Sequence, residues 1–418
     1  NPDDQPAGGG RGGQQNQQGK RELAWRFDGQ GLTYLEQEPA PATSRGTNRG
    51  GQAQAGDDDD QAGPPQRGGR GPGQAAQRKD RVYQWLPPFD DNSKKVVYEH
   101  PTRMTGHRFS PDMKVLFFSE RQGQNTLDKA VYLDDPTTQY TLARYRADDI
   151  YENPGSIVGV RGAGGGGRGG GGGGRGGFGG GGGPVLLSAD SEHVFYQGTI
   201  YDKNPNEVGP KTFIDKVAIK TGTKTRIYES DNNNVYERVS SILDPDAGRF
   251  IVTRESPTEV PQQYLLSGGQ RLQLTQNKDL TPDLTHMKVE RFTVERPDGF
   301  KFRVTVNLPK DFTPGSKPPA LFWFYPREYS DQESYDRPDR TYNKNSFPNF
   351  GTRSMEFFTR LGYAVVEPDS PIVGPQGAMN DNYVHDLRTN LSVVIDELDR
   401  RGLADRQRLA IGGHSYGA

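Results

Sequence analysis

The 418-residue sequence contains no cysteine, which excludes disulfides, thiol catalysis and thiolate metal sites. Apolar residues make up only 31% of the chain and glycine occurs 55 times, so a sizeable part of the chain cannot contribute to a hydrophobic core. There is no run of 18 or more apolar residues and no His-Glu-x-x-His motif. We therefore expect no membrane partner, no metal ion and no cofactor.

The charge balance gives no indication of a polyanionic partner. The formal net charge is −2, so the chain as a whole does not attract nucleic acid or an anionic membrane. The sequence begins at Asn1 rather than Met and opens with no signal sequence. The cellular location and the oligomeric state are left open.

Three segments are rich in Gly, Gln, Arg and Pro: residues 2–19, 39–77 and 162–183. Segments of this composition bury too little apolar surface to offset the entropy lost when a chain is ordered. We predict that they are disordered insertions on a folded body.

The Arg-Gly-Gly triplets in these insertions resemble those of RNA-binding proteins, so nucleic-acid binding is an alternative of a different class. Phe178 is the only aromatic residue in the three segments, and the Asp57–Asp60 run would repel phosphate. Both features argue against a nucleic-acid partner.

Between the insertions, a tight turn followed by an aromatic and β-branched run recurs along the chain. Asp190 and Asp246 of two such turns are 56 residues apart, and Asp112 and Asp190 are 78 apart, or about 56 without the glycine tract. Each copy predicts a turn leading into a central strand of a small antiparallel sheet. The copies span residues 109–118, 187–196 and 243–252, with a weaker one at 25–35.

Repeats of this length are typical of propeller blades, which must stack on one another to bury their faces. We therefore expect part of a β-propeller over residues 1–285. A β-sandwich with irregular strands is the alternative.

From residue 286 onwards, strand and helix patterns alternate, which predicts the first half of a doubly wound sheet. A helix over 382–401 is expected to end at Gly402 and to bury one apolar face. We assign residues 286–418 to the amino-terminal half of an α/β-hydrolase domain. The expected strands are 289–294, 302–308, 320–324 and 363–366, with a short helix at 354–361; the apolar face consists of Val384, Leu387, Leu391, Val394, Ile395 and Leu398.

The sequence from Gly413 to Gly417 fits the Gly-x-Ser-x-Gly pattern of a nucleophile elbow, in which a serine stands on a sharp strand-to-helix turn. The apolar run at 408–412 predicts a buried parallel strand just before it. Ser415 is therefore the candidate nucleophile, and a glycine-rich turn with a bystander serine is the alternative. In this architecture the triad Asp or Glu and then His follow the serine, so we expect both beyond residue 418 and expect this chain alone to be inactive.

Three stretches resemble the prolyl oligopeptidase family of serine peptidases, and within it the glutamyl endopeptidase branch: residues 321–329, residues 380–383, and 401–405 leading into 411–418. The resemblance implies a propeller before an α/β-hydrolase domain. It also implies a peptide or small protein substrate, with cleavage after Glu or Asp. An esterase or acylaminoacyl hydrolase of the same fold is the alternative.

The same resemblance implies two donors to the oxyanion of the reaction. One is the backbone N–H of Tyr416, and the other is the hydroxyl of Tyr325. A strand-end aromatic with its hydroxyl in water is the alternative for Tyr325. Arg327 and Glu328 follow the same strand end, and we interpret them as a solvated loop pair, with contact to the substrate as the alternative. We interpret Asp369 as a loop cap, with ligand binding at the carboxyl edge of the sheet as the alternative.

Overall fold

The computed structural model describes residues 19–39, 78–160, 183–205, 207–336, 343–352 and 354–418. The insertions predicted at 2–19, 39–77 and 162–183 lie almost entirely outside these ranges. The described residues form two compact units: one runs to residue 197 and includes 215–225, and the other comprises 198–214 with 226–418. The domain boundary at residue 285 stays a prediction.

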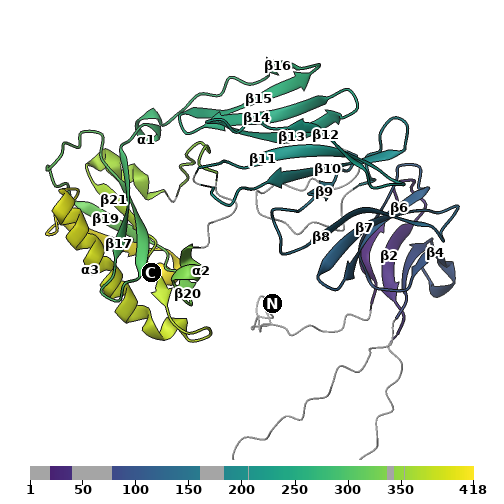
Figure 1. Cartoon of the computed structure of the whole chain (residues 1–418), viewed down its shortest axis with the longest axis horizontal. Helices are drawn as coiled ribbons and strands as arrows, with labels where there is room; N and C mark the ends of the chain where they lie inside the picture. The colour runs from purple at the N-terminus through teal and green to yellow at the C-terminus, as the bar shows by residue number, and fades with distance from the viewer. Residues whose placement is uncertain (1–18, 40–77, 161–182, 206, 337–342, 353) are drawn as a thin grey trace, which may run out of the picture. The chain divides into compact units, whose positions relative to one another are not determined.

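Four antiparallel sheets of four strands each precede the mixed sheet (Figure 1), and in every one the strands are neighbours in chain order. They are the propeller-like units that the repeat predicts. The first contains β1 (Arg21–Trp25), β2 (Leu32–Gln37), β3 (Asp80–Trp85) and β4 (Lys94–His100), and the second β5 (Met104–Phe109), β6 (Val115–Gln122), β7 (Asn125–Tyr132) and β8 (Gln139–Arg146). The third contains β9 (Ser156–Ile157), β10 (His193–Ile200), β11 (Lys211–Ala218) and β12 (Lys224–Glu229), and the fourth β13 (Tyr236–Asp244), β14 (Arg249–Ser256), β15 (Glu259–Ser267) and β16 (Gln270–Gln273).

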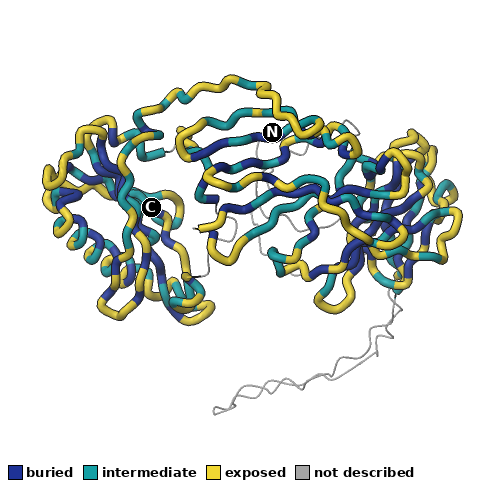
Figure 2. The backbone as a smooth tube through the Cα atoms, turned by 45° about the horizontal axis from the view of Figure 1, so that its top comes forward, coloured by how far each residue is buried: buried dark blue, intermediate teal, exposed yellow. Residues whose placement is uncertain are grey.

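In the first, second and fourth sheets the repeated turn joins the first strand to the second, and in the third it joins Leu187, which bridges to Val194, to β10. The Ser110 hydroxyl accepts the N–H of Val115 at 2.9 Å, and the Ser188 hydroxyl accepts the N–H of His193 at 3.0 Å. The second strand then lies between two neighbours, as predicted for a central strand. Figure 2 shows the consequence: the buried stretches run along strands, and the turns between them are exposed.

The mixed sheet has the strand order β17-β18-β21-β19-β23. The first two strands form an antiparallel hairpin, and β21, β19 and β23 run parallel to one another. The carboxyl ends of these three strands therefore meet at one edge of the sheet, where ligands bind in such folds. The strands are β17 (Val289–Glu295), β18 (Lys301–Asn307), β19 (Ala320–Phe324), β21 (Ala364–Pro368) and β23 (Leu409–Gly413).

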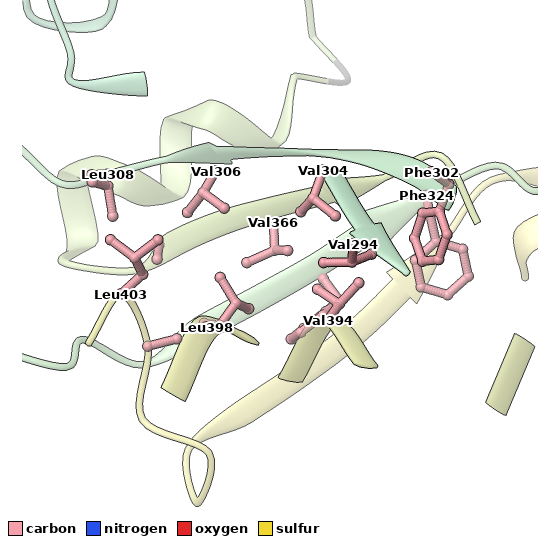
Figure 3. Packing of buried hydrophobic residues seen from close by; sticks show 14 of the residues in the cluster. Val294, Phe302, Val304, Val306, Leu308, Phe324, Val366, Val394, Leu398 and Leu403 are labelled. Carbon is pink, nitrogen blue, oxygen red and sulfur yellow. The ribbon is translucent and has the colours of Figure 1, made fainter. Parts of the chain in front are cut away.

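The helix α3 (Tyr383–Arg401) ends where Gly402 adopts a left-handed conformation with φ of 70°, which confirms the predicted helix and its stop. Val394 and Leu398 of α3 face Val304 and Val366 of the sheet in the core (Figure 3). The other elements are α1 (Pro282–Thr285), β20 (Glu328–Tyr329), α2 (Gln332–Asp336), β22 (Ile372–Val373) and the 3-10 helices η1 (Asp91–Ser93), η2 (Met355–Leu361), η3 (Met379–Asn382) and η4 (Ser415–Gly417). In the described ranges, no helix combines the length and apolar character needed to cross a bilayer.

Two details of the sequence-based prediction are wrong. Val384 is 61% exposed, and the buried stripe of α3 instead continues through two polar residues, Asp386 and Asn390. The strand β23 is parallel as predicted, but Ile411 is 63% exposed. The reason is that β19 is its only neighbouring strand among the described residues.

Candidate active site

Ser415 follows the end of β23 and therefore lies at the carboxyl edge of the sheet. Phe324 of β19 pairs with Gly413 at the last position of the parallel register, and η4 begins two residues later. Ser415 is exposed and has a φ of 54°, in the left-handed region that side chains other than glycine rarely adopt. A serine presented on a strained turn after a strand is the geometry of a nucleophile elbow.

Both glycines of the motif are required by the backbone of the elbow. A Cβ on Gly413 would lie 1.9 Å from the carbonyl oxygen of Gly417, and a Cβ on Gly417 would lie 2.4 Å from the carbonyl oxygen of Phe324. Neither gap admits a methyl group, so any larger residue would push the turn away from the end of β19.

The residue after the candidate nucleophile, Tyr416, is held at two points. Its carbonyl oxygen accepts a hydrogen bond from the Tyr383 hydroxyl at 2.5 Å, and its own hydroxyl donates to Glu328 Oε1 at 2.8 Å. Burial, together with the bond to the Glu328 carboxylate, raises the pKa of the Tyr416 hydroxyl to about 12. Within the described part of the chain, the Tyr416 amide donates to no backbone carbonyl.

Tyr325 follows the end of β19 and lies against the elbow. Its ring centroid is 6.3 Å from that of His414 and 6.4 Å from that of Tyr416. The side chain is 49% exposed, and its hydroxyl makes no hydrogen bond to another described residue. The three residues predicted for the site, Ser415, Tyr416 and Tyr325, thus lie together at one edge of the sheet.

The contacts of Glu328 and Tyr383 with Tyr416 were not predicted from the sequence. Glu328 is exposed, in agreement with the interpretation as a solvated residue, but its carboxylate also accepts the Tyr416 hydroxyl. Asp369 accepts hydrogen bonds from the Tyr335 hydroxyl at 2.5 Å and from Arg303 Nε at 3.2 Å, as expected of a residue that ties a loop in place. The motif at 380–383 pointed to the position of Tyr383, but not to its contact.

A buried ionic cluster holds the segments beside the elbow. Arg296 donates to Asp386 Oδ1 at 2.8 Å, and both side chains are at most 3% exposed. The second carboxylate oxygen accepts the backbone N–H of Val373 at 2.6 Å, and Asn390 donates to the carbonyl of Pro371 at 2.8 Å. The start of α3 is thereby fixed to β22, which pairs with β20, the strand that carries Glu328.

The histidines of the chain provide no assigned base. His414 is within the elbow and packs near the ring of Tyr325, and His385 lies on an exposed part of α3. Over the ranges that the structure describes, no three His, Asp or Glu side chains gather closely enough to hold a metal ion.

Comparison with known proteins identifies relatives but no family model that matches the chain. The probable chloroplastic glutamyl endopeptidases of Oryza sativa subsp. japonica and Arabidopsis thaliana are each 32% identical to it over 224 residues. The match covers 50% of this chain but only 24% and 23% of those proteins.

Among solved structures, the dipeptidyl peptidase 4 of Porphyromonas gingivalis aligns with a TM-score of 0.44 and 13% identity. That alignment covers 94% of this chain and 56% of the peptidase, a likeness too low to bear on function. The sequence identity over half of the chain is what establishes kinship: the chain is homologous to these two probable glutamyl endopeptidases over the matched segment.

Proposed function

We propose that the full-length protein is a serine peptidase that cleaves peptides through an acyl-enzyme on Ser415. The observation that carries this proposal is the strained elbow, which exposes the Ser415 hydroxyl beside two candidate oxyanion donors. The matched segment amounts to about a quarter of each relative, 24% and 23%, so the activity is proposed for the whole protein rather than for these 418 residues.

In the proposed reaction, Ser415 Oγ attacks the carbonyl carbon of the scissile peptide bond while a histidine accepts its proton. The oxygen of that carbonyl becomes an oxyanion, which the Tyr416 amide and the Tyr325 hydroxyl stabilise. The C–N bond then breaks, the leaving amine takes the proton, and water hydrolyses the ester on Ser415. The order Ser, Asp or Glu, His in this architecture predicts that the acid and the base follow residue 418.

A preference for cleavage after Glu or Asp is part of the proposal, because the plant relatives carry the name glutamyl endopeptidase. An acidic side chain needs a cation near the scissile bond. Arg327 is exposed, follows Tyr325 by two residues, and forms no ion pair with another described residue. It is the residue of this chain that we assign to the acidic side chain of the substrate.

The test uses the full-length protein and matched peptides that differ only by Glu or Gln before the cleaved bond. We expect hydrolysis after Glu, loss of all turnover in Ser415→Ala, and labelling of the wild type at Ser415 by a fluorophosphonate. Arg327→Gln should lower kcat/KM for the Glu peptide by about 10-fold or more, with little change for the Gln peptide. Hydrolysis of small esters but of no peptide would identify an esterase instead.

A further inference from the structure

Tyr416 is bonded at its backbone and at the far end of its side chain to residues distant in sequence. The Tyr383 hydroxyl holds its carbonyl at 2.5 Å, and the Tyr383 ring packs edge-to-face on the Tyr416 ring at 4.9 Å between centroids. Glu328 accepts the hydroxyl at the other end, at 2.8 Å. Since the pKa of that hydroxyl is about 12, it carries its proton at neutral pH and donates to the carboxylate.

Tyr383 and Glu328, which both contact Tyr416, lie on segments that the buried ionic cluster holds together. Tyr383 is the first residue of α3, and Asp386 in the first turn of that helix binds Arg296 and the Val373 amide. Val373 belongs to β22, whose pairing with β20 fixes Glu328 opposite Ile372. The buried cluster therefore sets the position of both groups that bond to Tyr416.

The elbow needs such support because its conformation is strained. Ser415 has a φ of 54°, and the turn is closed by hydrogen bonds from Gly417 N–H to His414 O at 2.9 Å and from Ala418 N–H to Ser415 O at 3.0 Å. A backbone held in a sparsely populated region persists only when its surroundings fix it. The direction of the Tyr416 amide depends on that turn, and an oxyanion donor works only when it is aimed at the developing charge.

We propose that Glu328 and Tyr383 are positioning residues, which hold Tyr416 from both ends so that its amide points at the oxyanion. This inference rests on the proposed peptidase activity. Neither side chain touches the reacting atoms, and the pair acts through Tyr416 alone. Interactions that matter only in the transition state change kcat and leave KM unaltered.

The first variant is Tyr383→Phe in the full-length protein, which keeps the ring stack and removes the bond to the Tyr416 carbonyl. We expect kcat to fall by about 10-fold with KM unchanged, since complete loss of an oxyanion donor costs roughly 100- to 1000-fold. The matched control is Tyr363→Phe, because Tyr363 precedes β21 at the opposite edge of the parallel strands and should leave both constants unaltered.

The second pair of variants separates positioning from folding. Glu328→Ala should lower kcat by about 10-fold, and Glu328→Gln, whose amide oxygen still accepts the Tyr416 hydroxyl, should recover most of that loss. Equal kcat in Tyr383→Phe, Glu328→Ala and wild type would overturn the inference while leaving the peptidase proposal intact. Absence of peptide hydrolysis in the wild type would instead refute the peptidase proposal, and with it the role assigned to the two residues.

Discussion

Two aspartates, Asp386 and Asp128, are each 2% exposed, but their partners differ. Asp386 binds the guanidinium of Arg296 and the amide of Val373, so a cation faces its charge. Among the described residues, the groups that donate to Asp128 of β7 are hydroxyls, of Ser119 at 2.6 Å and of Tyr196 at 3.2 Å.

The hydroxyls around Asp128 do not neutralise its charge. Burial raises the pKa of Asp128 to about 6, against the opposing effect of the Ser119 and Tyr196 hydroxyls. Lys224 exerts a weaker attraction on the same carboxyl. A buried carboxylate paired with an arginine serves as a fixed structural tie, whereas one surrounded by hydroxyls titrates near physiological pH.

The largest effect on stability is expected from removing the buried ion pair between Arg296 and Asp386. Asp386→Ala leaves Arg296 buried without its inner partner and leaves the Val373 amide without an acceptor, so the free energy of unfolding should fall by about 3–5 kcal/mol. Urea unfolding of the full-length variant measures this loss. Activity should fall with it, because Tyr383 and β22 share the anchor.

The matched control is Asp298→Ala, which removes the other carboxylate bound to Arg296. Asp298 is 53% exposed, against 2% for Asp386, so its loss should cost less than about 1 kcal/mol. If Asp386→Ala and Asp298→Ala lower the free energy of unfolding equally, burial does not determine how much each carboxylate bound to Arg296 stabilises the fold.

The burial of Asp386 could not be predicted from the sequence, whereas several turns could. Local features were sufficient for the hairpin turns at Ser110 and Ser188, and for the elbow around Ser415. In each of these the turn is specified by neighbouring residues and backbone sterics. The helix α3 was predicted from its apolar period, but that period placed Val384 on the buried face, where the structure has Asp386 and Asn390.

The missed residues share a physical cause. Asp386 is buried because Arg296, 90 positions away, neutralises it, and Glu328 is 88 positions from Tyr416. A polar residue gives no periodic signal that it will be buried, because its burial depends on a partner that only the fold brings near. The exposed face of β23 likewise depends on which strands lie beside it, not on its own apolar sequence.

The next largest effect is expected at Asp128, whose contribution to stability depends on pH. With a folded pKa near 6 and an unfolded value near 3.8, Asp128 binds its proton more tightly in the folded state. Its contribution to stability is therefore full below about pH 4 and is lost as the pH rises through 6. Asp128→Asn removes this loss and should stabilise the protein at pH 8 by on the order of 3 kcal/mol, with little effect at pH 4.

Urea unfolding of wild type and Asp128→Asn at the two pH values tests this sign. Asp112 is the control, since bonds from Ser110 and the Lys114 amide lower its pKa in spite of partial burial. Asp112→Asn should therefore remove a contribution that is present at neutral pH and lost in acid, the opposite dependence. A variant Asp128→Asn less stable than wild type at pH 8 would contradict the raised pKa.

The smallest effect is expected for Glu397, because the arginines that pair with it lie on the surface. Bonds to Arg400 and Arg401 on the surface of α3 lower the pKa of Glu397 to about 2, a shift as large as that of Asp128 but of opposite sign. Solvent screens such a pair, so Glu397→Gln should change the free energy of unfolding by only about 0.5 kcal/mol, and less in 1 M salt. Urea unfolding at low and high salt measures both quantities. A loss near that of Asp386→Ala would mean that pairing itself, and not the burial of the pair, determines how much a carboxylate stabilises this fold.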